Sequence, residues 1–299
     1  MADSKSTFYL VEPDIFLFTE CLHFLDRDYD DCLYSIEDDR VIKPLLIDGV
    51  QTLFKITDAS DRLKIELLAG EPSKAIVEEA ARYVTDWFDL ERNLHPFYQL
   101  LENHDPLSYM AAKYYGLRLM RIPDLFEALC WCVVGQQINL TFAHKLKRQL
   151  VETYGTFITY ESKRHYFFPE AEVLAGLAVD DLKELQFSRQ KAEYIIGIAK
   201  DVADGSLKKQ ELVAYDETQK MLKRLKKIRG VGDWTANYVL MKSLGRTDCI
   251  THGDTGLQSA VSQILGLDRK PTRKEVETFF EPFAGWESYL NMYLWRTLS

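Results

Sequence analysis

The chain has 299 residues, of which 46% are hydrophobic and 28% are charged, enough for two or three globular domains with hydrophobic cores. It contains no run of about 18 apolar residues, which argues against a membrane-spanning helix. The net charge of -9 argues against a uniformly basic nucleic-acid binder, although a charge summed over the chain does not describe any single face.

The first residues and the cysteines bear on the cellular compartment. Met-Ala-Asp-Ser-Lys lacks the apolar core of a secretory signal, which predicts a cytoplasmic protein. The cysteines are odd in number and lie within apolar patterns, as buried free thiols do in a reducing compartment. They are Cys21, Cys32, Cys130, Cys132 and Cys249. The absence of a Cys-x-x-Cys pair, and of any cysteine after Cys249, excludes a C-terminal cysteine-ligated cluster.

Residues 1–87 are predicted to form a small α+β domain with an antiparallel sheet. Asp48-Gly49 between two apolar runs is a strong signal for a β-hairpin. Helical patterns at 15–24 and 74–88 flank five β-prone runs, at 7–11, 32–36, 41–47, 51–56 and 63–68.

From residue 88 onward the patterns are almost entirely helical, with breaks at Gly, Pro, Asp or Asn. We expect a mainly α protein in which residues 88–299 form an all-α body with a cleft between two lobes, roughly 115–230 and 88–114 plus 231–299. The chemistry is expected to line this cleft. The helical patterns are 95–103, 105–115, 122–134, 139–154, 171–176, 178–185, 188–204, 216–228, 233–244, 254–265, 272–283 and 285–298.

A glycine hairpin, Gly230-Val231-Gly232, joins two of these helical patterns, and Asp233 is expected to cap the second. The glycines let the backbone approach a ligand, and the amides and dipole at the start of the second helix favour a phosphate. Because Gly-x-Gly is a weak pattern by itself, an ordinary interhelical turn is the alternative. The first helix adds a basic face, made of Lys220, Lys223, Arg224, Lys226, Lys227 and Arg229.

Asp254 begins a strongly amphipathic helix, so taken alone it is interpreted as an N-cap. A carboxylate at a helix N-terminus also keeps a fixed negative charge, which some reactions require. His252 is interpreted as a structural residue or as a phosphate or substrate contact, since no nearby serine or cysteine indicates a nucleophile.

Two aromatic pairs and one polar break complete the set of candidate residues. Trp234 with Tyr238, and Trp286 with Tyr289, are spaced so that each pair shares one helix face. Core packing is one interpretation of these pairs, and stacking on a flat base is the other. Gly135-Gln136-Gln137 is either a simple turn or a loop that wedges an amide side chain between two parts of a ligand.

With these residues in place, the chain resembles the helix-hairpin-helix DNA glycosylase superfamily, and within it the 3-methyladenine DNA glycosylase II family. The resemblance covers most of residues 86–299, and the N-terminal sheet is similar to the first, TBP-like, domain of that family. Several motifs in the same order are more specific than any one of them, and they favour a catalytic role for Asp254. The motifs are Gly230-Val231-Gly232-Asp233-Trp234-Thr235-Ala236-Asn237-Tyr238, Phe126-Glu127-Ala128, Ser188-Arg189-Gln190-Lys191-Ala192-Glu193-Tyr194 and Gly285-Trp286-Glu287-Ser288-Tyr289.

The resemblance implies how the protein would hold DNA. The backbone around Gly230, Gly232 and Thr235, together with Arg229, would bind a phosphate. Gln137 would fill the gap left by a flipped nucleotide. No cofactor and no catalytic metal are expected, but a monovalent cation is expected to bridge to the DNA from the carbonyls of Lys226, Ile228 and Val231.

The resemblance also implies the chemistry, which is excision of alkylated purines such as 3-methyladenine and 7-methylguanine in base excision repair. The cationic base would stack in a pocket made of Trp234, Tyr238, Trp286 and Tyr289. Asp254 would stabilise the oxocarbenium-like sugar and direct water at C1′, hydrolysing the N-glycosidic bond.

Trp234 stands where bifunctional members of the superfamily carry a nucleophilic lysine, so no amine is placed to form an imine. We therefore expect a monofunctional enzyme that leaves an abasic site. Thr255 departs from the family pattern, which has an aromatic residue there, and Gln186-Phe187 replaces a more usual Leu-Gly. The first departure bears on the range of substrates.

Two alternatives stay open: a glycosylase for deaminated or oxidised bases, and a non-catalytic helix-hairpin-helix DNA-binding protein. The expected partner is double-stranded DNA with alkylated bases. We expect a monomer without membrane attachment, located in the cytoplasm at the nucleoid.

Overall fold

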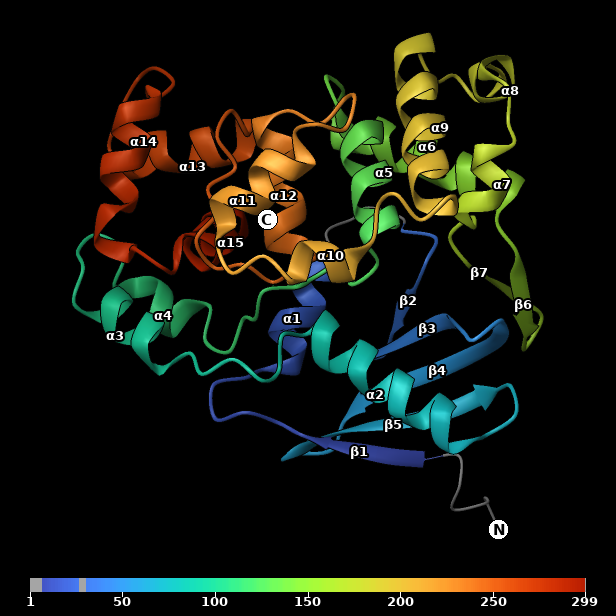
Figure 1. Ribbon diagram of the computed structural model, residues 1–299. Helices are drawn as coiled ribbons and strands as arrows, with labels where there is room; N and C mark the ends of the chain where they lie inside the picture. The colour runs from blue at the N-terminus through green and yellow to red at the C-terminus, as the bar shows by residue number, and fades with distance from the viewer. Residues whose placement is uncertain (1–6, 27–30, 299) are drawn as a thin grey trace. The chain divides into compact units, whose positions relative to one another are not determined.

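The computed structural model describes residues 7–26 and 31–298 (Figure 1). Contacts divide the chain into two compact units. Unit 1 comprises Met1–Glu12, Asp28–Trp87 and Leu129–Lys208, and unit 2 comprises Pro13–Arg27, Phe88–Ala128 and Lys209–Ser299. In the part of the chain that the structure describes, no helix has the length and apolar character needed to cross a membrane.

Unit 1 contains the predicted antiparallel sheet. Its strand order is β1-β5-β4-β3-β2, and every neighbouring pair is antiparallel. The prediction of an N-terminal antiparallel sheet is therefore confirmed. The strands are β1 (Thr7–Val11), β2 (Ser35–Glu37), β3 (Arg40–Ile47), β4 (Val50–Asp58) and β5 (Arg62–Ala69).

Tight two-residue turns join β2 to β3 and β3 to β4. Asp48 and Gly49 have φ angles of 49° and 77°, and Ile47 pairs with Val50 across them. Both angles are positive, as the type I′ hairpin turn requires. Asp38-Asp39 makes the same kind of turn without glycine, with φ angles of 47° and 57°.

One helix, α2 (Lys74–Trp87), runs across the sheet (Figure 1). Ile76, Ala80, Val84 and Trp87 recur at helical spacing and are all buried. Each large apolar side chain buried in this way contributes about 1.5–3 kcal/mol to the free energy of unfolding. The helix contacts β3 and β1. The buried residues of the sheet include Val41, Leu45, Leu53, Ile56, Leu63 and Ile65.

The helical part of unit 1 follows the predicted patterns but contains a hairpin that was not predicted. The helices are α5 (Leu125–Gly135, within unit 1 from Leu129), α6 (Leu140–Tyr154), α7 (Ala171–Ala175), α8 (Val179–Glu184) and α9 (Arg189–Ala203). Between α6 and α7 lie β6 (Phe157–Tyr160) and β7 (Lys163–Tyr166). Their turn, Glu161-Ser162, has φ angles of 47° and 64°, and these residue types give no hairpin signal.

Unit 2 is all helical in the residues that the structure describes, apart from its turns. Only α10 was not predicted, and the helix expected over 105–115 is shorter, as α4. The helices are α1 (Phe18–Leu25), α3 (His95–Glu102), α4 (Tyr109–Lys113), α10 (Lys209–Val213), α11 (Thr218–Leu225), α12 (Asp233–Lys242), α13 (Thr255–Ile264), α14 (Arg273–Phe280), η1 (Glu281–Phe283) and α15 (Glu287–Arg296), with the start of α5.

Helix α1 was assigned to the N-terminal domain, but its contacts place it in unit 2. The backbone N–H of Leu17 donates to the carbonyl of Gly116 at 3.1 Å, and Glu20 pairs with Arg296 at 2.6 Å. The contact-based units therefore cut across the predicted domains 1–87 and 88–299. Those domain boundaries, and the lobes, stay predictions.

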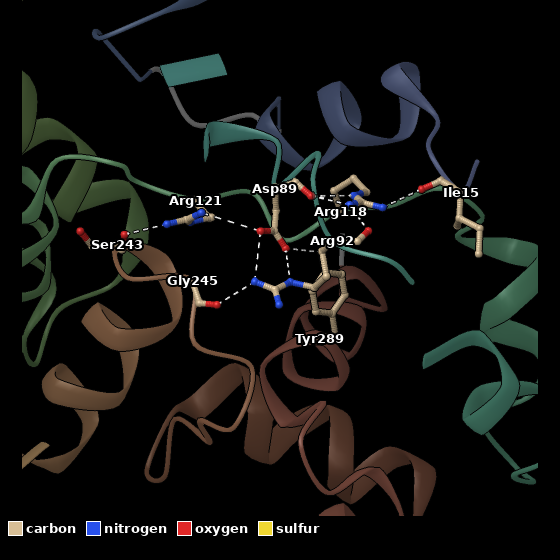
Figure 2. Close-up of polar contacts among 8 residues, drawn as sticks. All are labelled: Ile15, Asp89, Arg92, Arg118, Arg121, Ser243, Gly245 and Tyr289. Carbon is tan, nitrogen blue, oxygen red and sulfur yellow. Dashed lines mark hydrogen bonds and ion pairs between the residues drawn. The ribbon is translucent and has the colours of Figure 1, made fainter. Parts of the chain in front are cut away.

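A buried carboxylate, Asp89, ties α12 to α15 within unit 2 (Figure 2). Its Oδ2 accepts hydrogen bonds from Nε of Arg92 and from the hydroxyl of Tyr289 on α15, both at 2.6 Å. Its Oδ1 lies 3.7 Å from Nη1 of Arg121. The two guanidiniums continue to the chain that leaves α12. Arg92 donates to the carbonyl of Gly245 at 2.9 Å, and Arg121 donates to the carbonyl of Ser243 at 3.0 Å.

This Asp89 cluster explains two local features. Gly245 has a φ of 66°, and a Cβ there would lie 2.8 Å from the guanidinium carbon of Arg121, so the close approach requires glycine. The fully buried Arg118 binds the same segment by donating to the backbone carbonyls of Ile15, Asp89 and Arg92. Arg92 and Arg121 are favoured beside Gly245 and Ser243, because the C-terminal end of α12 carries the negative end of its helix dipole.

Candidate nucleic-acid interface and active site

The predicted glycine hairpin lies between α11 and α12. Gly230 has a φ of 92°, a conformation that side chains disfavour. Gly232 is the N-cap of α12, and a Cβ on it would meet no atom within 4 Å. Asp233 is therefore the first helical residue and not the cap, contrary to expectation, because its carboxylate pairs with Lys226 instead of the helix amides.

The surroundings of the hairpin are basic on one side. Lys223, Lys227 and Arg229 are exposed. Lys220, by contrast, forms ion pairs with Asp216 at 3.2 Å and with Glu217 at 2.9 Å. The pairing with Lys226 holds the pKa of Asp233 below its ordinary value. The exposed amide end of α12 thus lies beside several cations, an arrangement that suits an anion.

Asp254 is the N-cap of α13, as expected, and three donors surround its carboxylate. Its Oδ1 accepts the backbone N–H of Leu257 at 2.7 Å and the indole N–H of Trp295 at 2.9 Å. Its Oδ2 accepts the indole N–H of Trp234 at 3.1 Å. The group is half-buried, and the N-terminus of α13 favours its negative charge.

The two indoles that donate to this carboxylate form an aromatic cluster with Tyr238. Trp234 and Tyr238 on α12 stack with ring centroids 5.2 Å apart and an angle of 30° between the rings. Tyr238 lies 6.0 Å from Trp295 on α15. All three are half-buried. Trp295 was not among the predicted site residues, and its only signal in the sequence is that it lies seven positions after Ser288, on one helix face.

The structure does not bring the other predicted pair to this place. Tyr289 is fully buried, and its hydroxyl donates to Asp89. Trp286 lies 5.8 Å from Phe97 and 5.6 Å from Tyr289. Trp286 and Trp295 are nine residues apart along α15, about 13 Å at the helical rise. The prediction that Tyr289 belongs to a base pocket is corrected, because its ring and hydroxyl are used in the core of unit 2.

His252 lies in the loop before Asp254 and is half-buried. Its Nε2 is 3.8 Å from a carboxylate oxygen of Glu277 on α14. Burial, with the nearby charge of Arg273, lowers the pKa of His252. The imidazole is therefore held neutral around pH 7, which suits a structural residue better than a cationic contact.

Gln137 lies in unit 1, in the turn between α5 and α6. It is exposed and has a φ of 58°, a left-handed backbone conformation that is uncommon for a residue other than glycine. Two contacts fix the ends of this turn. Asn139 caps α6 by accepting the N–H of Phe142 at 2.8 Å, and Lys191 donates to the carbonyl of Val134 at 2.7 Å.

The five cysteines are free thiols, of which Cys21, Cys130, Cys132 and Cys249 are buried and Cys32 is half-buried. Burial raises the pKa of Cys132 and of Cys249 well above the ordinary value. The prediction of buried free thiols is confirmed for these four, and the raised pKa keeps Cys132 and Cys249 in the unreactive protonated form.

Two protein-family models match the chain. Residues 130–284 match the model of the HhH-GPD superfamily base excision DNA repair proteins. Residues 24–129 match the N-terminal domain of 8-oxoguanine DNA glycosylase.

A curated relative and two solved structures are similar to most of the chain. A DNA-3-methyladenine glycosylase of Bacillus subtilis (strain 168) is 39% identical over 290 residues, which cover 96% of this chain and 95% of the relative. A 3-methyladenine DNA glycosylase structure from Archaeoglobus fulgidus has a TM-score of 0.84 at 22% identity, over 98% of this chain and 99% of that one.

The second structure is the Clostridium acetobutylicum 8-oxoguanine glycosylase/lyase in complex with double-stranded DNA. It has a TM-score of 0.77 at 18% identity, over 98% of this chain and 95% of that one. Both structures share the fold but are described with different damaged bases, so the fold alone does not select a substrate.

Proposed function

Because the chain belongs to the HhH-GPD superfamily of base excision DNA repair proteins, we propose that it acts as a DNA-3-methyladenine glycosylase that excises alkylated bases from DNA. The observation that carries the proposal is the Asp254 carboxylate, which accepts the indole N–H groups of Trp234 and Trp295, with the ring of Tyr238 next to both indoles. A cationic, flat substrate group matches both the charge and the rings.

Alkylation at N3 or N7 gives the purine a positive charge, so the base leaves as a neutral molecule with the electrons of the N-glycosidic bond. No strong general acid is needed for that departure. Asp254 stabilises the positive charge that develops on the sugar and directs the water that adds at C1′. The products are the free base and an abasic site.

The base pocket proposed here differs from the predicted one in that Trp286 and Tyr289 are left out and Trp295 is added. Trp234 and Tyr238 are kept, and Trp295 joins them, since its ring borders the carboxylate. Trp286 is half-buried and lies with Phe97. Thr255, which follows Asp254, is exposed, so a small polar side chain stands there instead of a further ring.

The hairpin holds the DNA backbone. The amides of Gly230, Gly232 and Thr235 bind a phosphate with help from Arg229, and Gln137 enters the gap left by the flipped nucleotide. The carbonyls of Lys226, Ile228 and Val231 are suited to a monovalent cation. Ile228 accepts the N–H of Val231 at 3.1 Å, and a carbonyl has a second lone pair for a cation.

The enzyme is monofunctional, because α12 offers no nucleophilic amine. The one lysine on α12 is Lys242, which is buried and donates to the backbone carbonyl of Met120. Borohydride reduction during the reaction should therefore trap no covalent adduct between enzyme and DNA. A trapped adduct would contradict this part of the proposal.

The experiment that tests the proposal compares the native chain with Asp254→Asn on methylated duplex DNA. Asparagine keeps the N-cap but removes the charge, so we expect release of 3-methyladenine or 7-methylguanine to fall by about a hundredfold or more. Asp124→Asn is the matched control, because Asp124 also caps a helix by accepting the N–H of Glu127 at 2.7 Å.

Equal release by Asp254→Asn and the native chain would defeat the mechanism. Release from DNA carrying hypoxanthine or an oxidised base, with none from methylated DNA, would favour the first alternative. Binding without release of any base would favour a DNA-binding scaffold. The monomeric state and the cytoplasmic location at the nucleoid stay predictions.

A further inference from the structure

One face of α15 carries three polar groups in a row. Ser288, Asn291 and Trp295 are spaced at i, i+3 and i+7, which places them on the same side of the helix. The first two are fully buried, and the third is half-buried. Each of the three contacts a successive part of one chain segment, residues 247–254.

Ser288 binds the beginning of that segment. Its backbone N–H donates to the carbonyl of Thr247 at 2.8 Å. Its hydroxyl accepts the N–H of Cys249 and donates to the carbonyl of Cys249, both at 3.3 Å. The segment thus lies along α15 with its backbone polar groups satisfied by a side chain.

Asn291 binds the middle of the segment. Its Oδ1 accepts the backbone N–H of Thr251 at 3.2 Å and the hydroxyl of Thr251 at 2.7 Å. Thr251 is fully buried as well. Its carbonyl accepts the backbone N–H of Asp254 at 3.0 Å, so Thr251 is the base of the short turn from which the Asp254 carboxylate projects.

Trp295 contacts the end of the segment through its bond to Oδ1 of Asp254. Along α15, Ser288 and Asn291 therefore hold the backbone of the segment, and Trp295 holds the carboxylate. Asn291 is central, because it alone accepts two donors from Thr251, the residue on which the turn is built.

The amide nitrogen of Asn291 shows that this residue is poorly suited to a purely stabilising role. Among the residues that the structure describes, this buried Nδ2 has no hydrogen-bond partner. A buried donor without a partner lowers the free energy of unfolding. An apolar side chain of similar size would avoid that cost but would leave Thr251 unanchored.

We propose that Asn291 is a positioning residue for catalysis, which holds the Asp254 carboxylate at the depth and angle that the reaction requires by anchoring Thr251. This inference rests on the proposed function of Asp254. It assigns to Asn291 no contact with DNA, so the residue acts on the rate of bond cleavage and leaves DNA binding unchanged.

The test uses three variants of the full chain. Asn291→Leu removes the acceptor of both donors of Thr251. Thr251→Val combined with Asn291→Leu replaces both side-chain partners with apolar groups, so that only the backbone N–H of Thr251 loses its acceptor. Met292→Leu is the matched control, because Met292 is the next residue of α15, is fully buried, and keeps its volume in this exchange.

Three quantities are measured for each variant: the single-turnover rate of base release from methylated duplex, the Kd for a duplex containing a tetrahydrofuran abasic-site analogue, and the Tm. We expect both Asn291 variants to lose between about tenfold and a hundredfold in rate, the usual effect of a carboxylate misplaced by about 1 Å. Their Kd should stay within about twofold of the native value, and Met292→Leu should keep its rate.

Native rates in both Asn291 variants would overturn the proposal, as would an equal loss of rate in Met292→Leu or a parallel loss of DNA affinity. The native chain in the same assay separates the two hypotheses. If the native chain releases no methylated base, the proposed function is wrong. If the native chain releases the base and the Asn291 variants do so at the same rate, only the positioning role of Asn291 is wrong.

Discussion

Trp295 donates its indole N–H to Oδ1 of Asp254 at 2.9 Å, across 41 positions of sequence. The same indole therefore has two roles, since it donates to the carboxylate and also lies next to Tyr238 in the aromatic cluster. A ligand that stacks on Trp295 therefore meets the negative charge directly, and the position of the charge depends on the position of the ring.

Replacing Trp295 separates these two contributions. Trp295→Phe keeps a ring but loses the donor to a charged acceptor, a bond worth about 1.5–3 kcal/mol, so the rate of base release should fall by about tenfold or more. Trp295→Leu should in addition raise KM, because stacking is lost. Single-turnover and steady-state assays on methylated DNA measure both. A native rate in Trp295→Phe would show that the bond has no part in catalysis.

The two hairpin glycines should respond differently to alanine. Gly230→Ala forces a side chain into a φ of 92° and should lower the free energy of unfolding by about 1–2 kcal/mol. Gly232→Ala has open space for its Cβ, so the Tm should not change, but affinity for duplex DNA should fall by about tenfold because the methyl group stands where a phosphate approaches. Thermal unfolding and DNA titration of both variants check this. Unchanged affinity in Gly232→Ala would argue against a phosphate at the hairpin.

The Asp89 cluster should be required for the stability of unit 2. Asp89→Asn leaves Arg92 and Arg121 without their anion and should lower the free energy of unfolding by about 3–5 kcal/mol. Tyr289→Phe removes one donor from Oδ2 and should lower it by about 1–3 kcal/mol. Tyr109→Phe, at an exposed tyrosine, is the control. Because Tyr289 and Asp89 share a bond, the double variant should lose less than the sum of the single losses.

Glu12 should give unit 1 a dependence on pH. Burial, with the nearby charges of Asp58 and Asp61, raises the pKa of Glu12 from an ordinary value of 4.5 to about 7. Below about pH 4.5 the carboxyl is protonated in both folded and unfolded chains, so its full contribution to stability is present. As the pH rises towards 7 the unfolded chain ionises first, and that contribution is lost.

Glu12→Gln should therefore be more stable than the native chain at pH 8, by on the order of 1 kcal/mol since the group is partly exposed, and the advantage should vanish near pH 4.5. Urea unfolding of the pair at pH 4.5, 6 and 8 measures the difference. An advantage that is constant over this range would refute the assignment to Glu12.

Local signals explain what could be read from the sequence. The Asp48-Gly49 hairpin and the glycine turn between α11 and α12 each depend on a few neighbouring residues. The β6–β7 hairpin was not predicted, because Glu161-Ser162 adopts a left-handed turn for which those residue types have no marked preference.

Long-range contacts explain what could not be read. Asp89 contacts Arg121 and Tyr289 only once the chain has folded. Tyr289 was predicted to line the pocket because its spacing from Trp286 shows that the two rings share a helix face. Spacing does not show whether that face points to the core or to a ligand. Helix α15 is buried nearly all round, with Ser288–Leu294 all inaccessible, so it has no amphipathic contrast to show that Trp295 faces Asp254.

The turns that lack glycine leave room for engineering. Asp38-Asp39 and Glu161-Ser162 hold four L-residues in a left-handed backbone, at a cost of roughly 1 kcal/mol each. Asn-Gly at either turn would relieve that strain in unit 1. A heat-tolerant version of the protein, suited to detecting alkylation damage in vitro, is therefore within reach of two small loop exchanges.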